Sequence, residues 1–245
     1  MAQGSFTFAG VSSETLGLII TGADTYNIPN RRFDSIKIPG RSGNLIQDDG
    51  AFQNIDITYH AAVVTEGTGG ANSALAALST ALMQYPGYQI LRDTYHPNTY
   101  RRAVVKDIIS VRAYRPQSGA PYRAAAFDII FNCMPQRYRD DGEVAQAIGT
   151  TLTNPTGLPS APLITVTGGA GTITIGAQEL TVLSGATLPL IIDCETMDAY
   201  TVTAEGKSNQ NAFVILPIHD VRLYAGETTT SGSVSGTIAP KWYEI

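Results

Sequence analysis

The sequence predicts a mainly β protein of two modules, each a β-sandwich or a barrel, with one α-helix in the first module. Apolar and polar residues alternate along most of the 245 residues, which is typical of half-buried strands. Turns rich in glycine, serine and threonine separate these segments, as in sandwiches and barrels. Charge is unevenly divided: residues 1–139 hold 13 of the 16 basic and 10 of the 21 acidic residues, a net +3, and residues 140–245 carry −8. This division favours two modules with different surfaces.

The predicted strands occur in both parts of the chain. They share alternation and β-branched or aromatic residues, and the clearest are residues 55–63, 125–134, 172–183, 188–197 and 212–224. Between the two groups, a Pro/Gly/Ser-rich stretch predicts a connector. We therefore expect a first domain over 1–138, a linker over 139–160 and a second domain over 161–245.

One segment breaks the period of two and predicts a helix over about 72–84. Its leucines recur at i, i+3 and i+7, which forms one apolar stripe: Leu75, Leu78 and Leu82. Asn72 or Ser73 could cap the start, and Pro86 and Gly87 would end the helix. The stripe predicts that the helix packs across a sheet face.

Glycine-rich segments could be active-site loops or turns. In residues 38–60, Ser42 lacks the Gly-x-Ser-x-Gly spacing of a nucleophile elbow, and no lysine follows as in a phosphate-binding loop. Residues 168–176 lack the third glycine and the helix of a dinucleotide site. We predict that the glycines of 38–60 turn the chain and start a hairpin. Asp-Asp-Gly at 48–50 and 140–142 predicts tight turns with glycine at positive φ.

The titratable side chains form no recognisable metal or catalytic motif. No two of the three histidines lie within four residues of each other: His60, His96 and His219. Cys133 and Cys194 have no paired spacing and are expected to be buried hydrophobes. Asp193 and Glu195 would share one strand face as a solvated acidic edge, with a weak cation site as the alternative. We therefore expect no enzyme activity, no catalytic or metal-binding residue and no cofactor.

The basic residues point to protein contacts rather than to nucleic acid. Nucleic-acid binding needs a concentrated basic patch, and a net charge of +3 spread over residues 1–139 is too small to indicate one. Exposed arginine and tyrosine are enriched at protein interfaces. The basic residues occur in small groups at 31–32, 101–102 and 112–115, and the pair 101–102 lies in a predicted strand along which tyrosine and arginine alternate. A solvated strand face is the alternative. No apolar run reaches the about 20 residues of a membrane span, and we expect no secretory signal.

Several stretches together resemble the distal tail proteins (Dit family) of long, flexible-tailed bacteriophages. They are FTFAGVSSETLGLII (6–20), IPGRSGNLIQDDGAFQNIDITY (38–59), YPGYQILRDTYHPNTYRRAVV (85–105), AAFDIIFNCMPQRY (125–138) and the closing IAPKWYEI (238–245). The matching residues near the start are Phe6, Phe8, Gly10, Gly17, Pro39, Gly40, Arg41, Gly43, Asp49, Gly50, Phe52 and Asn54. The resemblance covers nearly the whole chain.

The resemblance implies a structural hub in the virion, at the tail tip, made in the host cytoplasm. It implies a homo-hexameric ring, possibly stacked, that joins the tail tube protein to the tail-tip or baseplate hub protein, without nucleic-acid or membrane partners. The N-terminal domain, a β-sandwich or split barrel with one helix, would build the ring. A galectin-like β-sandwich would follow, and the last strand (about 234–245) could pair back with the first domain.

As a hypothesis, five arginines contribute to ring or tube contacts: Arg31, Arg32, Arg41, Arg101 and Arg102. The alternative function is a carbohydrate-binding adhesion module that acts through the C-terminal sandwich, and a glycan-degrading enzyme is a third reading. Because the chain lacks the large inserted modules of some family members and has no aromatic cluster, direct sugar binding is not expected.

Overall fold

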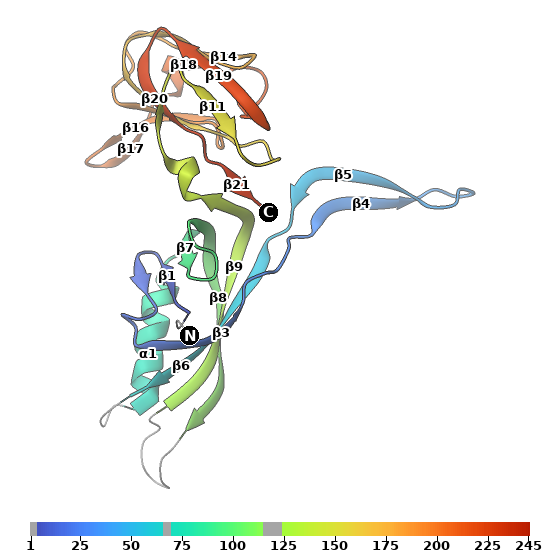
Figure 1. Cartoon of the computed structure of the whole chain (residues 1–245), viewed down its shortest axis with the longest axis vertical. Coiled ribbons are helices and arrows are strands. Elements are labelled where there is room, and N and C mark those ends of the chain that lie inside the picture. Colours follow the sequence, from blue (N-terminus) through green and yellow to red (C-terminus); the bar gives the residue numbers. More distant parts are fainter. Residues whose placement is uncertain (1–3, 66–69, 115–123) are drawn as a thin grey trace. The chain divides into compact units, whose positions relative to one another are not determined.

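The computed structural model describes residues 4–65, 70–114 and 124–245, which form two compact units (Figure 1). The first extends to Arg137 and the second comprises Tyr138–Glu244. In the described residues, strands predominate and there is one α-helix, α1 (Gly70–Met83). The predicted mainly β class with one helix is confirmed. None of the helices in these ranges has the length and apolar character of a membrane span.

The first unit is built on one curved sheet. Seven strands lie in the order β2-β1-β7-β8-β9-β6-β3. Their bounds are β1 (Phe6–Phe8), β2 (Val11–Ser12), β3 (Leu18–Asp24), β6 (Ile55–Val64), β7 (Gln89–Asp93), β8 (Thr99–Tyr114) and β9 (Ala124–Arg139). In β6 alternate residues are buried, as the sequence predicts. The central contact is aromatic, since the ring of Phe131 lies 5.4 Å from Phe6 and 5.1 Å from Phe8, within the range of favourable ring pairs.

Helix α1 covers this core with its leucine stripe. Leu78 and Leu82 are buried and Leu75 packs, partly buried, against the same core, so the predicted stripe is confirmed. The helix contacts β6 and β8. It begins at Gly70, so Asn72 and Ser73 lie inside its first turn and the predicted cap at these residues is wrong.

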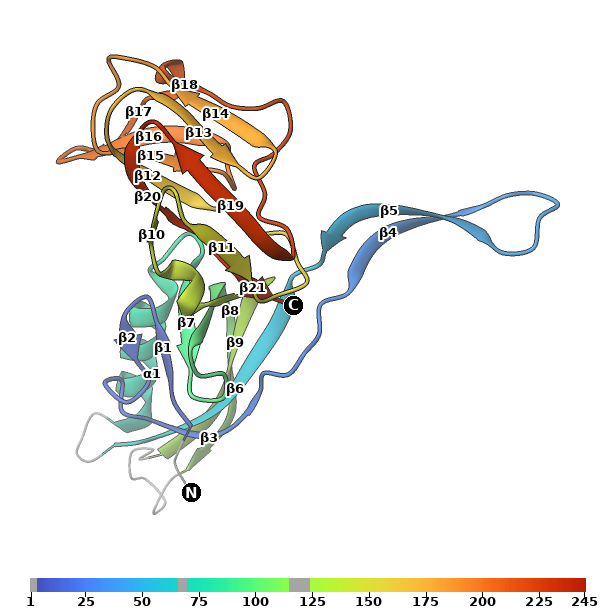
Figure 2. The same cartoon turned by 45° about the horizontal axis from the view of Figure 1, so that its top comes forward.

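The second unit is a sandwich of two sheets (Figure 2). One sheet has the order β10-β20-β12-β15-β16-β17 and the other β11-β19-β13-β14-β18. The bounds are β10 (Gln146–Ala147), β11 (Thr151–Asn154), β12 (Leu163–Gly168), β13 (Gly171–Ile175), β14 (Gln178–Val182), β15 (Leu190–Asp193), β16 (Asp198–Thr203), β17 (Gly206–Asn209), β18 (Val214–Ile215), β19 (Gly226–Gly232) and β20 (Ser235–Ala239). Both sheets supply the core, for example Ile164 and Ile192 from one and Ile173 and Leu180 from the other. Residues 139–160, where a linker is predicted, contain β10 and β11, which pair within this sandwich.

The two ends of the second unit are joined. The N–H of Lys241 donates to the carbonyl of Gly142 (2.7 Å), and the N–H of Arg139 donates to the carbonyl of Trp242 (2.9 Å). The last short strand of the second unit is β21 (Tyr243–Glu244). The predicted tight turn at 140–142 is instead a 3₁₀ helix (Asp140–Glu143) in which Gly142 is buried. A Cβ on Gly142 would lie 2.3 Å from the backbone nitrogen of Trp242, so close approach rather than positive φ requires this glycine.

Candidate functional site

A long two-stranded arm of the first unit is exposed along nearly all of its length. It consists of β4 (Arg31–Lys37) and β5 (Asn44–Phe52), which in the described part of the chain pair only with each other. All of β4 and the first seven residues of β5 are exposed. Figure 1 shows the two strands running together away from the sheet of this unit. An isolated hairpin of this kind is only marginally stable in water, so the arm is suited to being covered by another surface.

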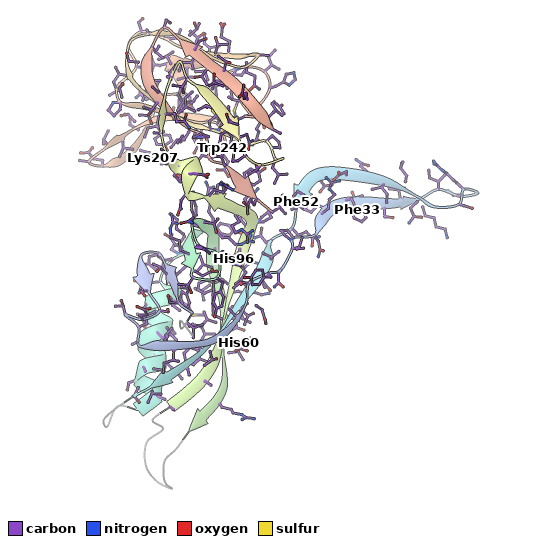
Figure 3. All side chains as sticks on the ribbon, in the orientation of Figure 1. Phe33, Phe52, His60, His96, Lys207 and Trp242 are labelled. Atoms are coloured by element: carbon purple, nitrogen blue, oxygen red, sulfur yellow. The ribbon has the colours of Figure 1, made fainter. Side chains whose placement is uncertain are left out.

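Apolar side chains lie on both faces of the arm. Ile36 and Leu45 are direct cross-strand partners on one face. On the other face, Ile46 faces Ser35 and lies diagonally from Phe33, at the spacing where large side chains still meet. These four side chains are 43–55% exposed, and Phe33 is labelled on the arm in Figure 3. An arm surrounded by water gains no stability from apolar residues on both faces. An arm that lies between surfaces of a partner protein would bury these residues, and exposed apolar patches often mark such contacts.

The tip of the arm is the glycine-rich segment that resembles an active-site loop. Gly40 and Gly43 have φ of 76° and 82°, a region that glycine adopts at no steric cost. The N–H of Arg41 donates to the carbonyl of Ile38 (3.3 Å) and closes the turn. The prediction that these glycines turn the chain into a hairpin is confirmed, and Arg41 is exposed at the tip.

The predicted turn at 48–50 is wrong, because these residues form a bulge inside β5. The register passes from Arg31–Phe52 to Phe33–Asp48, so β5 has extra residues opposite Arg32. Gly50 has φ of 69°, as such a bulge needs. The bulge carboxylates form ion pairs with the arginines of β4: Arg31–Asp48 (3.1 Å) and Arg32–Asp49 (3.3 Å). Both pairs are exposed, so each contributes at most about 1 kcal/mol.

A polar network anchors the root of the arm to the sheet. The side-chain amide of Asn27, which precedes the arm, donates to the carbonyl of Asp56 (2.7 Å). The Asp56 carboxylate accepts from Asn132 (2.9 Å) and pairs with Lys106, and the Lys106 hydrogen bond is the main cause of its lowered pKa. Asn54, which follows the arm, donates to Asn132 (2.8 Å). Sequence reasoning missed this network, because polar residues on the outward face of strands carry no distinguishing pattern.

The five predicted interface arginines lie in different environments. Arg31, Arg32 and Arg41 belong to the arm, and Arg102 is half-buried on β8. Arg101 is 7% exposed and its guanidinium donates to the carbonyl of Pro135 (3.0 Å). Burial lowers its pKa. The expectation that Arg101 is exposed is therefore wrong, because the alternation of β8 turns its side chain inward.

The other titratable candidates have structural partners or are buried. The ring of His60 lies 2.7 Å from Asp128 and 3.5 Å from Asp24, and the Asp128 bond is the main cause of its raised pKa. Cys133 and Cys194 are both buried and unpaired, and burial raises each thiol pKa to about 12. In the described ranges, no group of three acidic, histidine or cysteine side chains could hold a metal ion.

Asp193 and Glu195 do not share a strand face as predicted. Strand β15 ends at Asp193 and Glu195 lies in the following turn, where its N–H donates to the Asp193 carboxylate (2.9 Å). The chain turns here instead of continuing the strand, and Met197 in the same turn has φ of 57°. An acidic edge of two aligned carboxylates is therefore absent at this pair.

Comparison with known proteins identifies the fold. No family model matches the chain and no curated protein does. Among solved structures, the Dit (gp 19.1) protein of phage SPP1, described as a paradigm of hub adsorption apparatus in Gram-positive-infecting phages, aligns with a TM-score of 0.73 and 13% identity over 97% of both chains. A chain of the activated phage P2 baseplate with Ca aligns with a TM-score of 0.57 and 6% identity over 97% of this chain and 98% of its own, and a chain of the Sr form aligns equally well over 96% and 97%. The chain therefore has the fold of a phage distal tail (Dit) protein.

Proposed function

We propose that this chain is a structural subunit of a phage tail hub, a homo-hexameric ring between the tail tube and the tail tip or baseplate. The shared fold with the SPP1 hub protein over 97% of the chain supports the hub role. The observation that carries the proposal of self-assembly is the arm, which exposes Phe33, Ile36, Leu45 and Ile46 on two opposite faces. The partners are further copies of this chain, the tail tube protein and the tail-tip hub protein.

The arm suits the contacts of a closed ring. A closed ring uses heterologous contacts, in which each copy donates one surface and receives a different one. The arm can act as such a donated surface, because it projects from the sheet of the first unit (Figure 1). Covering four half-exposed apolar side chains would contribute about 4 kcal/mol per arm before the cost of association.

The charges of the arm favour specificity rather than affinity. Arg31 and Arg32 already pair with Asp48 and Asp49, so they stiffen the arm and remain only partly available to a neighbour. Arg41 is exposed at the tip and forms no ion pair among the described residues. We propose that Arg41 meets an acidic surface of the next copy, since exposed charges at an interface mainly set orientation and association rate.

Native mass spectrometry of the full chain tests this function. The expected mass is about six times the 26.0 kDa subunit. Phe33→Asp combined with Ile46→Asp should shift the protein to monomers, because it places charge in a buried contact. Ile218→Asp is the matched control, since Ile218 is 99% exposed in the second unit, and it should assemble normally. Equal masses for all three proteins would contradict the proposed role of the arm.

A further inference from the structure

The second unit has a polar hollow of about 240 Å³ on the outer face of its six-stranded sheet. We propose that this hollow binds one saccharide unit of a cell-surface glycan. Its lining includes Asp193, Asp198, Tyr200, Lys207 and Asn209. The absence of inserted modules argues against sugar binding by an added domain, but the sandwich forms this hollow from its own strands β15, β16 and β17.

Strand register brings the lining residues together. Asp193 is the cross-strand partner of Asp198, and Tyr200 is the partner of Asn209. Ala199, between Asp198 and Tyr200 on β16, is buried, so Asp198 and Tyr200 share the outward face. Residues separated by up to 16 positions in sequence therefore converge at the β17 edge of the sheet, where β17 is exposed along its length.

The lining offers both acceptors and donors to a ligand. One oxygen of Asp193 accepts from the N–H of Glu195, and one oxygen of Asp198 accepts from Asn211. Asn209 uses its side-chain oxygen to accept from the N–H of Asn211. Within the described second unit, the other carboxylate oxygens and the Asn209 NH₂ group have no hydrogen-bond partner. Two acceptors beside an amide donor suit neighbouring hydroxyl groups, each of which can donate and accept.

An aromatic ring completes the site. The ammonium of Lys207 lies 4.0 Å from the centroid of the Tyr200 ring, and Figure 3 labels Lys207 at the edge of the second unit. Lys207 is exposed, so its cation–π contact is weak and the flexible side chain can leave the ring. The electron-rich face of the ring would then meet the polarised C–H groups of a sugar. The two carboxylates repel an anionic ligand. The NH₂ group of Asn209 can only donate hydrogen bonds, so it cannot coordinate a metal cation.

A single shallow site of this kind binds weakly. In the proposed ring, six copies would engage one glycan surface together, and linked weak sites gain avidity without new contacts. Only this gain in avidity depends on the proposed function. The site itself belongs to one chain, so binding of a monosaccharide is expected whether or not the ring forms.

Saturation-transfer NMR on the full chain tests the site, and it works for monomer and ring alike. The probes are the methyl glycosides of glucose, galactose and N-acetylglucosamine, at concentrations well above millimolar. At least one should receive saturation. Tyr200→Ala should weaken its binding about tenfold or more, whereas Lys207→Met, which uncovers the ring, should leave binding equal or stronger.

Asn209→Asp keeps the acceptor for Asn211 but replaces the amide donor with a negatively charged acceptor beside the two aspartates, so it should also weaken binding even if Tyr200→Ala fails to fold. Tyr224→Ala is the control, because Tyr224 is 61% exposed in the same unit and does not line the hollow. No saturation of any of the three sugars, or equal binding by Asn209→Asp and wild type, would overturn the proposal.

Discussion

Replacing Arg101 by alanine should destabilise the first unit by about 3 kcal/mol. A hydrogen bond from a charged donor contributes about 1.5–3 kcal/mol, and the variant leaves the buried carbonyl of Pro135 without its 3.0 Å donor. The three methylenes of the side chain add about 0.8 kcal/mol each when buried. Releasing the guanidinium from its buried site offsets part of this loss, since burial of the charge is unfavourable, as its lowered pKa indicates.

Urea unfolding followed by circular dichroism measures this loss. Arg112→Ala is the matched control, since Arg112 is exposed on the same strand, and it should change stability by less than about 0.5 kcal/mol. Trp242, the one tryptophan of the chain, is buried in the second unit, so its fluorescence should show that unit unaffected. An unchanged urea midpoint for Arg101→Ala would refute the structural role of Arg101 and would support the prediction that Arg101 is an exposed surface residue.

Three further predictions concern packing, pH and thiol chemistry. Gly142→Ala should destabilise the second unit by about 1–3 kcal/mol, seen in Trp242 fluorescence, because its Cβ would lie 2.3 Å from the Trp242 nitrogen. The ion pairs of His60, whose pKa its carboxylate partner raises, should stabilise the fold fully below about pH 6.5 and be lost as pH rises through the folded-state pKa. Cys133 and Cys194, whose pKa burial raises to about 12, should resist alkylation at pH 8 until the chain unfolds.

Each of these has a control and a contradicting result. Gly157→Ala, in the same unit and with nothing within 4 Å of the new Cβ, should unfold like wild type; a midpoint shift equal to that of Gly142→Ala would show that close packing is not the cause. His60→Gln should abolish the difference in stability between pH 6 and pH 9. Because the His60 side chain is 42% exposed, solvent screening limits the effect to about 1 kcal/mol, and an increase in stability with pH would have the wrong sign. Rapid labelling of both native thiols would contradict their burial.

The sequence predicts elements whose pattern is local. The alternation of β6 and the leucine stripe of α1 are confirmed because burial follows periods of two and 3.6. The arm shows no such alternation, since both of its faces carry apolar residues, as at Phe33 and Ile36. A glycine at positive φ serves a turn or a bulge equally well, which is why the sequence misplaces a turn at Gly50 and correctly places one at Gly40.

The missed parts of the candidate sites depend on contacts between distant residues. The sequence predicts Arg101 to be a surface residue because the carbonyl that accepts its hydrogen bond belongs to Pro135, 34 positions away in the sequence. Likewise, only the register of β15 and β16 makes Asp193 and Asp198 neighbours. A single sequence carries no signal for such pairs, since pairing depends on topology rather than on local spacing.

Hydrogen exchange of the arm is the most direct test of self-assembly through this surface. The amides of residues 31–52 should exchange rapidly in dilute protein, because nearly all of the arm is exposed. In the assembled ring, the same amides should be protected about tenfold or more, since the covered arm can no longer open freely. A hexamer in which these amides exchange as rapidly as in the monomer would contradict the account, as would a chain that never assembles at any concentration.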